Sequence, residues 1–106
     1  MSLDVWLIDE GEEVYTANIT HNLNRMADAA GIYECLWRHD EIGITQAKQI
    51  IPLLETGLSK LVMQKTHFEQ FNSENGWGLW EHFVPFCAEY LQAFRDWPDA
   101  VVSVSR

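Results

Sequence analysis

Side chains able to bind a ligand or carry a proton are concentrated between Asn18 and Asn22, where a predicted strand meets a predicted helix. Asn18, Thr20, His21 and Asn22 supply two amides, a hydroxyl and an imidazole. With Thr20 as the N-cap, His21 and Asn22 fall in the first helical turn, where unpaired backbone N–H groups and the helix dipole favour an anion. The same residue types more commonly satisfy the chain's own backbone groups. The junction is therefore interpreted either as a self-capping turn or as an anion or carboxylate site.

A second polar segment, residues 72–78, has the sequence NSENGWG and is predicted to be a loop. Trp77 lies there between two glycines, where its ring can plug the core or stand at a binding surface, and burial is favoured because it stabilises aromatic side chains so strongly. The alternative predicts a ligand pocket between residues 20–22 and residues 75–78. Its candidate residues include Asn75 and Trp77, together with Tyr33 and Glu34 from the segment after the helix.

Catalytic chemistry has little support in the sequence. The chain contains no GxSxG, P-loop, dinucleotide-binding glycine or HExxH pattern, and its four histidines are too widely spaced for a local metal site. If the protein is an enzyme, His21 is the best general base, with Glu34 or Glu81 orienting its ring. We assign no catalytic residue, no metal ligand and no cofactor.

The balance of charge limits the partners. The chain has 16 acidic and 7 basic side chains, a formal net charge of −9, which disfavours binding to nucleic acid phosphates. A basic protein partner is compatible with this charge, and so is simple solubility. The acidic run from Asp9 to Glu13 lacks the spacing of an EF-hand loop and is predicted to be a solvated turn.

The compartment is predicted from what the sequence lacks. No apolar run is long enough to cross a bilayer, and residues 1–10 have neither the basic nor the apolar region of a signal peptide, so we expect a cytoplasmic protein without membrane contact. Cys35 and Cys87 fall on apolar helical faces without CxxC spacing, which predicts two buried, reduced thiols.

Strands are expected at both ends of the chain. Residues 3–8 alternate, with Leu3, Val5 and Leu7 on one side. Gly11 then permits a turn, and residues 14–17 return as the second strand of a hairpin. Residues 100–105 alternate valine with serine and predict a terminal strand that joins the hairpin.

The first two helices are predicted from apolar residues spaced three and four apart. A helix capped by Thr20 or Asn18 and ended by Gly31 should bury Ile19, Leu23, Met26, Ala27 and Ala30. A short helix follows, burying Ile32, Cys35 and Leu36 and turning Tyr33, Glu34 and Trp37 away.

Three further helices are predicted after residue 43. Thr45 should cap a helix with an apolar stripe from residue 47 to residue 62, and Thr66 should cap a short helix through a capping box. Residues 79–96 should form the most buried helix. Pro52 and Pro85 fall on the solvent sides of their helices, which predicts kinks rather than breaks.

These elements predict an α+β fold in a single domain, residues 1–106. A small sheet of two or three strands from both chain ends should be covered on one face by three or four helices.

Several segments resemble those of a family of small uncharacterised bacterial and phage-borne proteins. They are YTANITHNLNRMADAAGIYECLW, which contains NITHNL, then IIPLLETGL, NGWG and the terminal SVSR. The resemblance spans nearly the whole chain and implies no activity. It marks these positions as matching the family pattern: Asn18, Thr20, His21, Asn22, Asn75, Gly76, Trp77 and Arg106.

Two classes of function remain. The first is a non-catalytic module that binds a protein partner or a small ligand through an aromatic-rich surface, suggested by five tryptophans, more than the core alone needs. The alternative is a small-molecule enzyme or ligand-binding protein with its pocket between residues 20–22 and 75–78. A flat aromatic patch would favour a partner, and a concave pocket containing His21 and Trp77 would favour a ligand. The sequence leaves the oligomeric state open.

Overall fold

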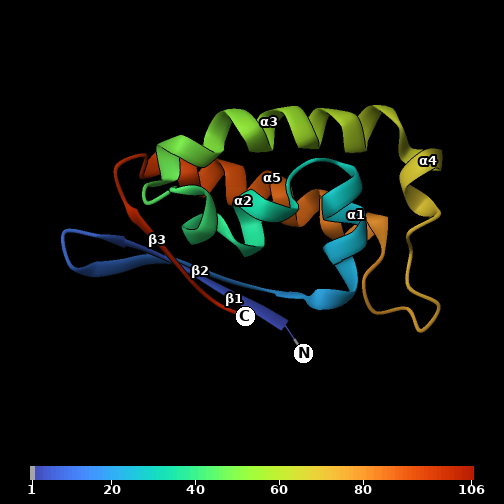
Figure 1. Ribbon diagram of the computed structural model, residues 1–106, viewed down its shortest axis with the longest axis horizontal. Helices are drawn as coiled ribbons and strands as arrows, with labels where there is room; N and C mark the ends of the chain where they lie inside the picture. The colour runs from blue at the N-terminus through green and yellow to red at the C-terminus, as the bar shows by residue number, and fades with distance from the viewer. Residues whose placement is uncertain (1) are drawn as a thin grey trace.

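Strand β1, Ser2–Asp9, is the central strand of a three-stranded antiparallel sheet in the order β2-β1-β3. The computed structural model describes residues 2–106 and pairs β1 with β2, Glu12–Thr20, and with β3, Val101–Ser105. Figure 1 shows the helices on one side of this sheet, with β2 leading directly into the first helical turns. The predicted α+β fold, with strands from both chain ends, is confirmed.

The alternation in β1 produces one fully buried face. Leu3, Val5 and Leu7 are each 0% exposed. Their counterparts on the opposite face, including Trp6, are partly exposed, because no helix covers that side in Figure 1. The hairpin turn has Glu10 and Gly11 at positive φ, as tight two-residue turns require. The second strand is longer than the predicted residues 14–17, because β1 offers partners along its whole length.

Two long helices lie side by side over the sheet. They are α3, Ala47–Met63, and α5, Trp80–Asp96, and Figure 1 shows α5 between α3 and the sheet. Pro52 and Pro85 are exposed and lie inside these helices without ending them. The shorter elements are η1, His21–Leu23; α1, Asn24–Ala29; α2, Tyr33–Trp37; η2, His39–Ile42; and α4, Lys65–Glu69. Within residues 2–106, no helix combines the length and apolarity that crossing a membrane requires.

The start of the central helix differs from its prediction. Ile19 belongs to β2 and pairs with Leu3, so β2 continues to Thr20, and a single 3-10 turn precedes the six-residue α1. Pairing with β1 keeps Ile19 in a strand although its spacing from Leu23 and Met26 suits a helix. The side chain is buried in the strand, as it would be in the helix. Thr20 is the predicted cap: its Oγ1 accepts a hydrogen bond from the N–H of Asn22 at 3.2 Å. Gly31 closes the segment at φ 79°, as predicted.

Two predicted helix caps are wrong. Gln46, not Thr45, occupies the N-cap position of α3, and Gln49 Oε1 accepts from the N–H groups of both Thr45 and Gln46. A glutamine at the third helical position can reach back to the N-cap N–H in this way. Thr66 does not cap α4, which begins at Lys65 with Gln64 at the cap position and no side-chain cap bond.

Trp37 does not turn away from the core, contrary to the prediction from the sequence. It is 1% exposed and belongs to the one hydrophobic core that both strands and helices share. On the same short helix Tyr33 is partly buried and Glu34 is exposed, as predicted.

Both cysteines are free and buried, which confirms their predicted placement. Burial raises the pKa of Cys35 to about 12 and raises the pKa of Cys87 as well. Thiolate is the reactive form. We therefore expect neither thiol to react with a thiol reagent in the native protein and both to react after denaturation, as counted by mass spectrometry of the labelled chain. Rapid native labelling of one site would show that its helix faces solvent.

The raised pKa of these thiols also sets a stability trend with pH. The two neutral thiols contribute fully to the free energy of unfolding below the pKa of an unfolded thiol, about 8.5. This contribution is lost as the pH rises from there toward the folded value of about 12 for Cys35, because only the unfolded chain then ionises.

Candidate functional site

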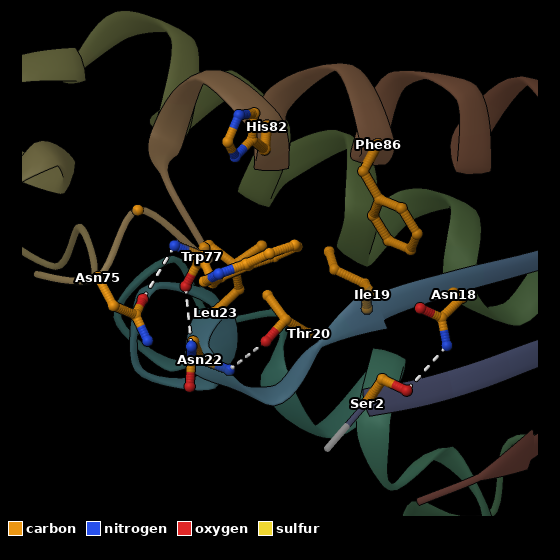
Figure 2. Close-up of a pocket in the computed structure, with 12 residues that line it drawn as sticks. Ser2, Asn18, Ile19, Thr20, Asn22, Leu23, Asn75, Trp77, His82 and Phe86 are labelled. Atoms are coloured by element: carbon orange, nitrogen blue, oxygen red, sulfur yellow. Dashed lines mark hydrogen bonds between the residues drawn. The ribbon is translucent and has the colours of Figure 1, made fainter.

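A pocket of about 640 Å³ lies where β2 ends, between the η1 turn, the loop at residues 73–78 and the first turns of α5 (Figure 2). We call it the Trp77 pocket. Its residues are Ser2, Asn18, Ile19, Thr20, Asn22, Leu23, Asn75, Gly76, Trp77, Gly78, His82 and Phe86. A pocket therefore occupies the place predicted between residues 20–22 and 75–78.

Trp77 is 72% exposed, so the prediction that it plugs the core is wrong. Its backbone is held from both sides. Asn75 Oδ1 accepts from the N–H of Trp77 at 2.9 Å and from Ser73 Oγ at 2.6 Å, and Asn22 Nδ2 donates to the carbonyl of Trp77 at 2.9 Å. Figure 2 shows the indole edge-on, extending from the loop toward Ile19 and Phe86. The hydrogen bonds thus fix the backbone of Trp77 beside the pocket, while its ring stays exposed.

The glycines beside Trp77 are required by this geometry. Gly76 and Gly78 have φ values of 80° and 104°, which L side chains rarely adopt. A Cβ on Gly78 would also lie 2.9 Å from the Cβ of Asn22. The two glycines therefore let the loop pack closely on η1 while Trp77 points outward.

The polar groups at the end of β2 are largely used by the protein itself. Asn18 Nδ2 donates to Ser2 Oγ at 2.9 Å and to Asp4 Oδ1 at 2.6 Å, and Figure 2 shows its amide oxygen on the side away from Ser2. Thr20 Oγ1 accepts the N–H of Asn22. The N–H of Asn22 is therefore already bonded, and only a three-residue 3-10 turn precedes the short α1. The predicted anion site would need free N–H groups and the dipole of a longer helix, so this geometry does not support it.

His21 does not line the pocket. Its Nδ1 accepts a hydrogen bond from Trp37 Nε1 at 2.9 Å, and Tyr33 stacks on Trp37 from another side, with ring centroids 5.6 Å apart. A role as general base would need a carboxylate hydrogen-bonded to His21, but the bonded partner of His21 is Trp37. His21 thus has the structural role that is commoner for such residues.

Three of the predicted site residues therefore lie outside the Trp77 pocket, namely His21, Tyr33 and Glu34. Arg106, marked by the family resemblance, also lies elsewhere: its Nη1 donates to the carbonyl of Trp37 and to Asp40 Oδ1, each at 3.0 Å. The hydrogen bond from Arg106 lowers the pKa of Asp40. The pocket does bring together Asn18, Thr20, Asn22, Asn75 and Trp77.

Sequence reasoning missed His82 and Phe86. They lie four residues apart on α5, so both side chains lie on the face of the helix that borders the pocket. That spacing, directly after NGWG, is a usable signal in the sequence. Ser2 left no such signal, because only the pairing of β1 with β2 brings it beside Asn18.

No protein-family model, curated protein or solved structure matches this chain. The family resemblance therefore stays a prediction. Over residues 2–106, no three His, Cys, Asp or Glu side chains gather in a geometry that could hold a metal ion. The candidate site is thus defined by its own geometry.

Replacing both His21 and Asn22 with alanine is expected to lower the free energy of unfolding by about 1–3 kcal/mol. The change removes the acceptor for Trp37 Nε1 and the donor to the carbonyl of Trp77. Chemical denaturation measures the loss, with Asp28→Ala, an exposed position on α1, as the matched control. Unchanged stability in the double variant would mean that the two side chains do not hold the junction together.

Proposed function

We propose that this protein is a non-catalytic binding module whose recognition site is the Trp77 pocket. The observation that supports the proposal most is the 72% exposure of Trp77 on a loop whose backbone donates to Asn75 and accepts from Asn22. An indole left in water forgoes the free energy that burial would supply. A loop built to hold it outward is typical of a position that another molecule covers on binding.

The chemistry of the pocket narrows the ligand. Ile19, Leu23, Trp77 and Phe86 give it apolar and aromatic walls, and its polar groups are amides, hydroxyls and the imidazole of His82. Its lining includes no Asp, Glu, Lys or Arg. Apolar walls with a few polar groups suit an uncharged group that has an apolar face and one or two hydrogen-bonding atoms.

The form of this surface favours a pocket over a flat aromatic patch. Among the five tryptophans, Trp37 is buried, Trp77 is strongly exposed, and Trp6, Trp80 and Trp97 are partly buried. Trp77 is thus the most exposed of the five, and it lines a concave site. We propose binding without reaction there because His21, the best candidate base from the sequence, lies outside the pocket and is bonded to Trp37, and because no Asp or Glu lines the pocket to orient the imidazole of His82.

The proposal keeps the cytoplasm as the compartment and a protein partner or small ligand as the binding target. Two free, buried thiols suit a reducing compartment. The net charge of −9 opposes nucleic acid as a target.

An NMR fragment screen tests the pocket. Uncharged aromatic, aliphatic and sugar fragments are added to ¹⁵N-labelled protein, and the indole Nε1–H signal of Trp77 is assigned by its loss in Trp77→Phe. We expect the binding fragments to shift this signal together with the backbone amides of residues 20–22 and 75–78. The shifts should vanish in Trp77→Ala and persist in Met63→Ala, which removes an exposed apolar side chain, 81% exposed, at another place. Fragment shifts that survive Trp77→Ala, or that cluster elsewhere, would contradict the proposal.

A further inference from the structure

The two outer edges of the sheet differ in what covers them. The outer edge of β3 is occupied at Val102, whose N–H donates to the carbonyl of Thr45 and whose carbonyl lies 3.0 Å from His39 Nε2. Gln46 extends this cover through a bridge to Val101. The outer edge of β2 has no comparable cover from any other segment of residues 2–106.

The pairing pattern identifies which groups of β2 face outward. Because both backbone groups of Val102 point away from β1, Val102 and Leu7 form a non-hydrogen-bonded pair. Leu7 therefore directs its N–H and carbonyl toward β2, and alternation along the ladder makes Thr16 and Asn18 the residues whose backbone groups point outward. Nothing else in the described chain bonds to those groups.

Nothing between Tyr15 and Thr20 of β2 blocks pairing there. Proteins usually protect a free edge with lysine, proline or a bulge. Glu12–Thr20 contains neither lysine nor proline. Its register shift falls opposite Leu7 and Ile8, toward the hairpin, and leaves the ladder from Tyr15 to Thr20 regular.

This free edge is continuous with the Trp77 pocket. Asn18 and Thr20 project from one face of β2 and Ile19 from the other, and all three line the pocket. The pocket therefore adjoins β2 on both faces near its end at Thr20. A chain lying along the backbone of Thr16 and Asn18 would therefore reach the pocket directly.

The acidic charge near β2 favours a basic segment at its outer edge. The hairpin at the other end of β2 carries Asp9, Glu10, Glu12 and Glu13, and the chain as a whole has a net charge of −9. A second copy of this chain would bring the same charge to the contact and be repelled. A segment with lysine or arginine beside the hairpin would be attracted.

We propose that the outer edge of β2 binds an extended, basic peptide segment of a partner protein as an added strand. One apolar side chain of the segment enters the Trp77 pocket, and its basic residues lie beside the hairpin. The backbone groups of Thr16 and Asn18 supply the affinity that is independent of peptide sequence, and the pocket supplies selectivity. This inference rests on the proposed function insofar as the same pocket receives the side chain.

Selection from a displayed library of short linear peptides tests the inference. We expect the selected peptides to share lysine or arginine toward one end and an apolar or aromatic residue toward the other, and to bind more weakly as salt rises. Synthetic copies with single backbone N-methyl groups should lose binding at alternate positions only, because alternate peptide N–H groups pair with β2. This scan leaves the protein unaltered, so it does not depend on any variant folding.

Two variants separate the edge from the pocket. Thr16→Pro removes an outward N–H while leaving the ladder to β1 intact, and it should weaken peptide binding by about tenfold or more; Thr16→Val keeps the N–H and should bind normally. Trp77→Ala should weaken binding by about thirtyfold.

Each result favours or overturns the inference. Peptides that lose binding in Trp77→Ala but tolerate every N-methyl group would overturn strand addition and leave the pocket function standing. Peptides sensitive to N-methylation and Thr16→Pro but indifferent to Trp77→Ala would support the edge and overturn the pocket function. An empty selection would overturn the inference, and so would a dimer in native mass spectrometry that Thr16→Pro dissociates, since a second copy would then occupy the edge.

Discussion

Replacing Trp37 with alanine is expected to lower the free energy of unfolding by about 3–5 kcal/mol, the range for deleting a large buried aromatic side chain. Trp37 is 1% exposed and its ring stacks with Tyr33, while its Nε1 donates to His21. The alanine would leave a cavity in the core and an unpaired acceptor on His21. Chemical denaturation monitored by circular dichroism measures the change.

Two further tryptophan variants serve as controls. Trp37→Phe keeps most of the ring but removes the donor, so it separates packing from the hydrogen bond to His21 and should cost much less. Trp77→Ala removes an equally large side chain that is 72% exposed and should change stability by about 0.5 kcal/mol or less. Similar losses at Trp37 and Trp77 would mean that the exposed ring packs against the protein in solution.

The second large effect is expected for Gly57→Ala, which should lower the free energy of unfolding by about 1–3 kcal/mol. Alanine normally stabilises a helix interior relative to glycine by about 1 kcal/mol. Gly57 lies in the middle of α3 and is buried, and a Cβ there would overlap Ile32 Cγ2 and lie 3.3 Å from the carbonyl of Ala30. The steric cost should therefore exceed the gain in helix propensity.

A double-variant cycle with Ile32→Ala checks the cause. If the new methyl group collides with Ile32, the combined loss in Gly57→Ala/Ile32→Ala should be smaller than the sum of the two single losses. Ser59→Ala, at an exposed position on the same helix, should be nearly neutral. A Gly57→Ala protein that is more stable than the parent would show that α3 can move away from Ile32.

Periodicity predicted the elements well where one pattern acted alone. The strand of residues 3–8 and the helix of residues 79–96 appear within one residue of their predicted bounds, since alternation and helical spacing there had no competitor. Ile19 was assigned wrongly because its spacing suits a helix, whereas its pairing with Leu3 depends on a strand elsewhere in the sequence. The importance of Gly57 was not visible at all, since only the packed structure brings Ile32 against it.

The candidate site shows the same limit. Asn22 and Trp77 were both singled out, but their hydrogen bond joins positions 55 residues apart. Local sequence could indicate that a tryptophan between glycines is unusual. Local sequence could not show that Asn22 and Asn75 bind the backbone of Trp77 and leave its ring exposed. It favoured a buried ring because tryptophan side chains are usually buried.

The strand order also has a consequence for the time at which the protein can complete its fold. β1 is the central strand, yet its neighbour β3 is synthesised about ninety residues later, after every helix. During translation the hairpin of β1 and β2 can pair early, because its contacts are local, while the other edge of β1 waits for residues 101–105. Closing the sheet is thus expected to be the last step, so a ribosome-bound chain stalled before residue 101 should expose β1 to chaperones that the finished protein no longer attracts.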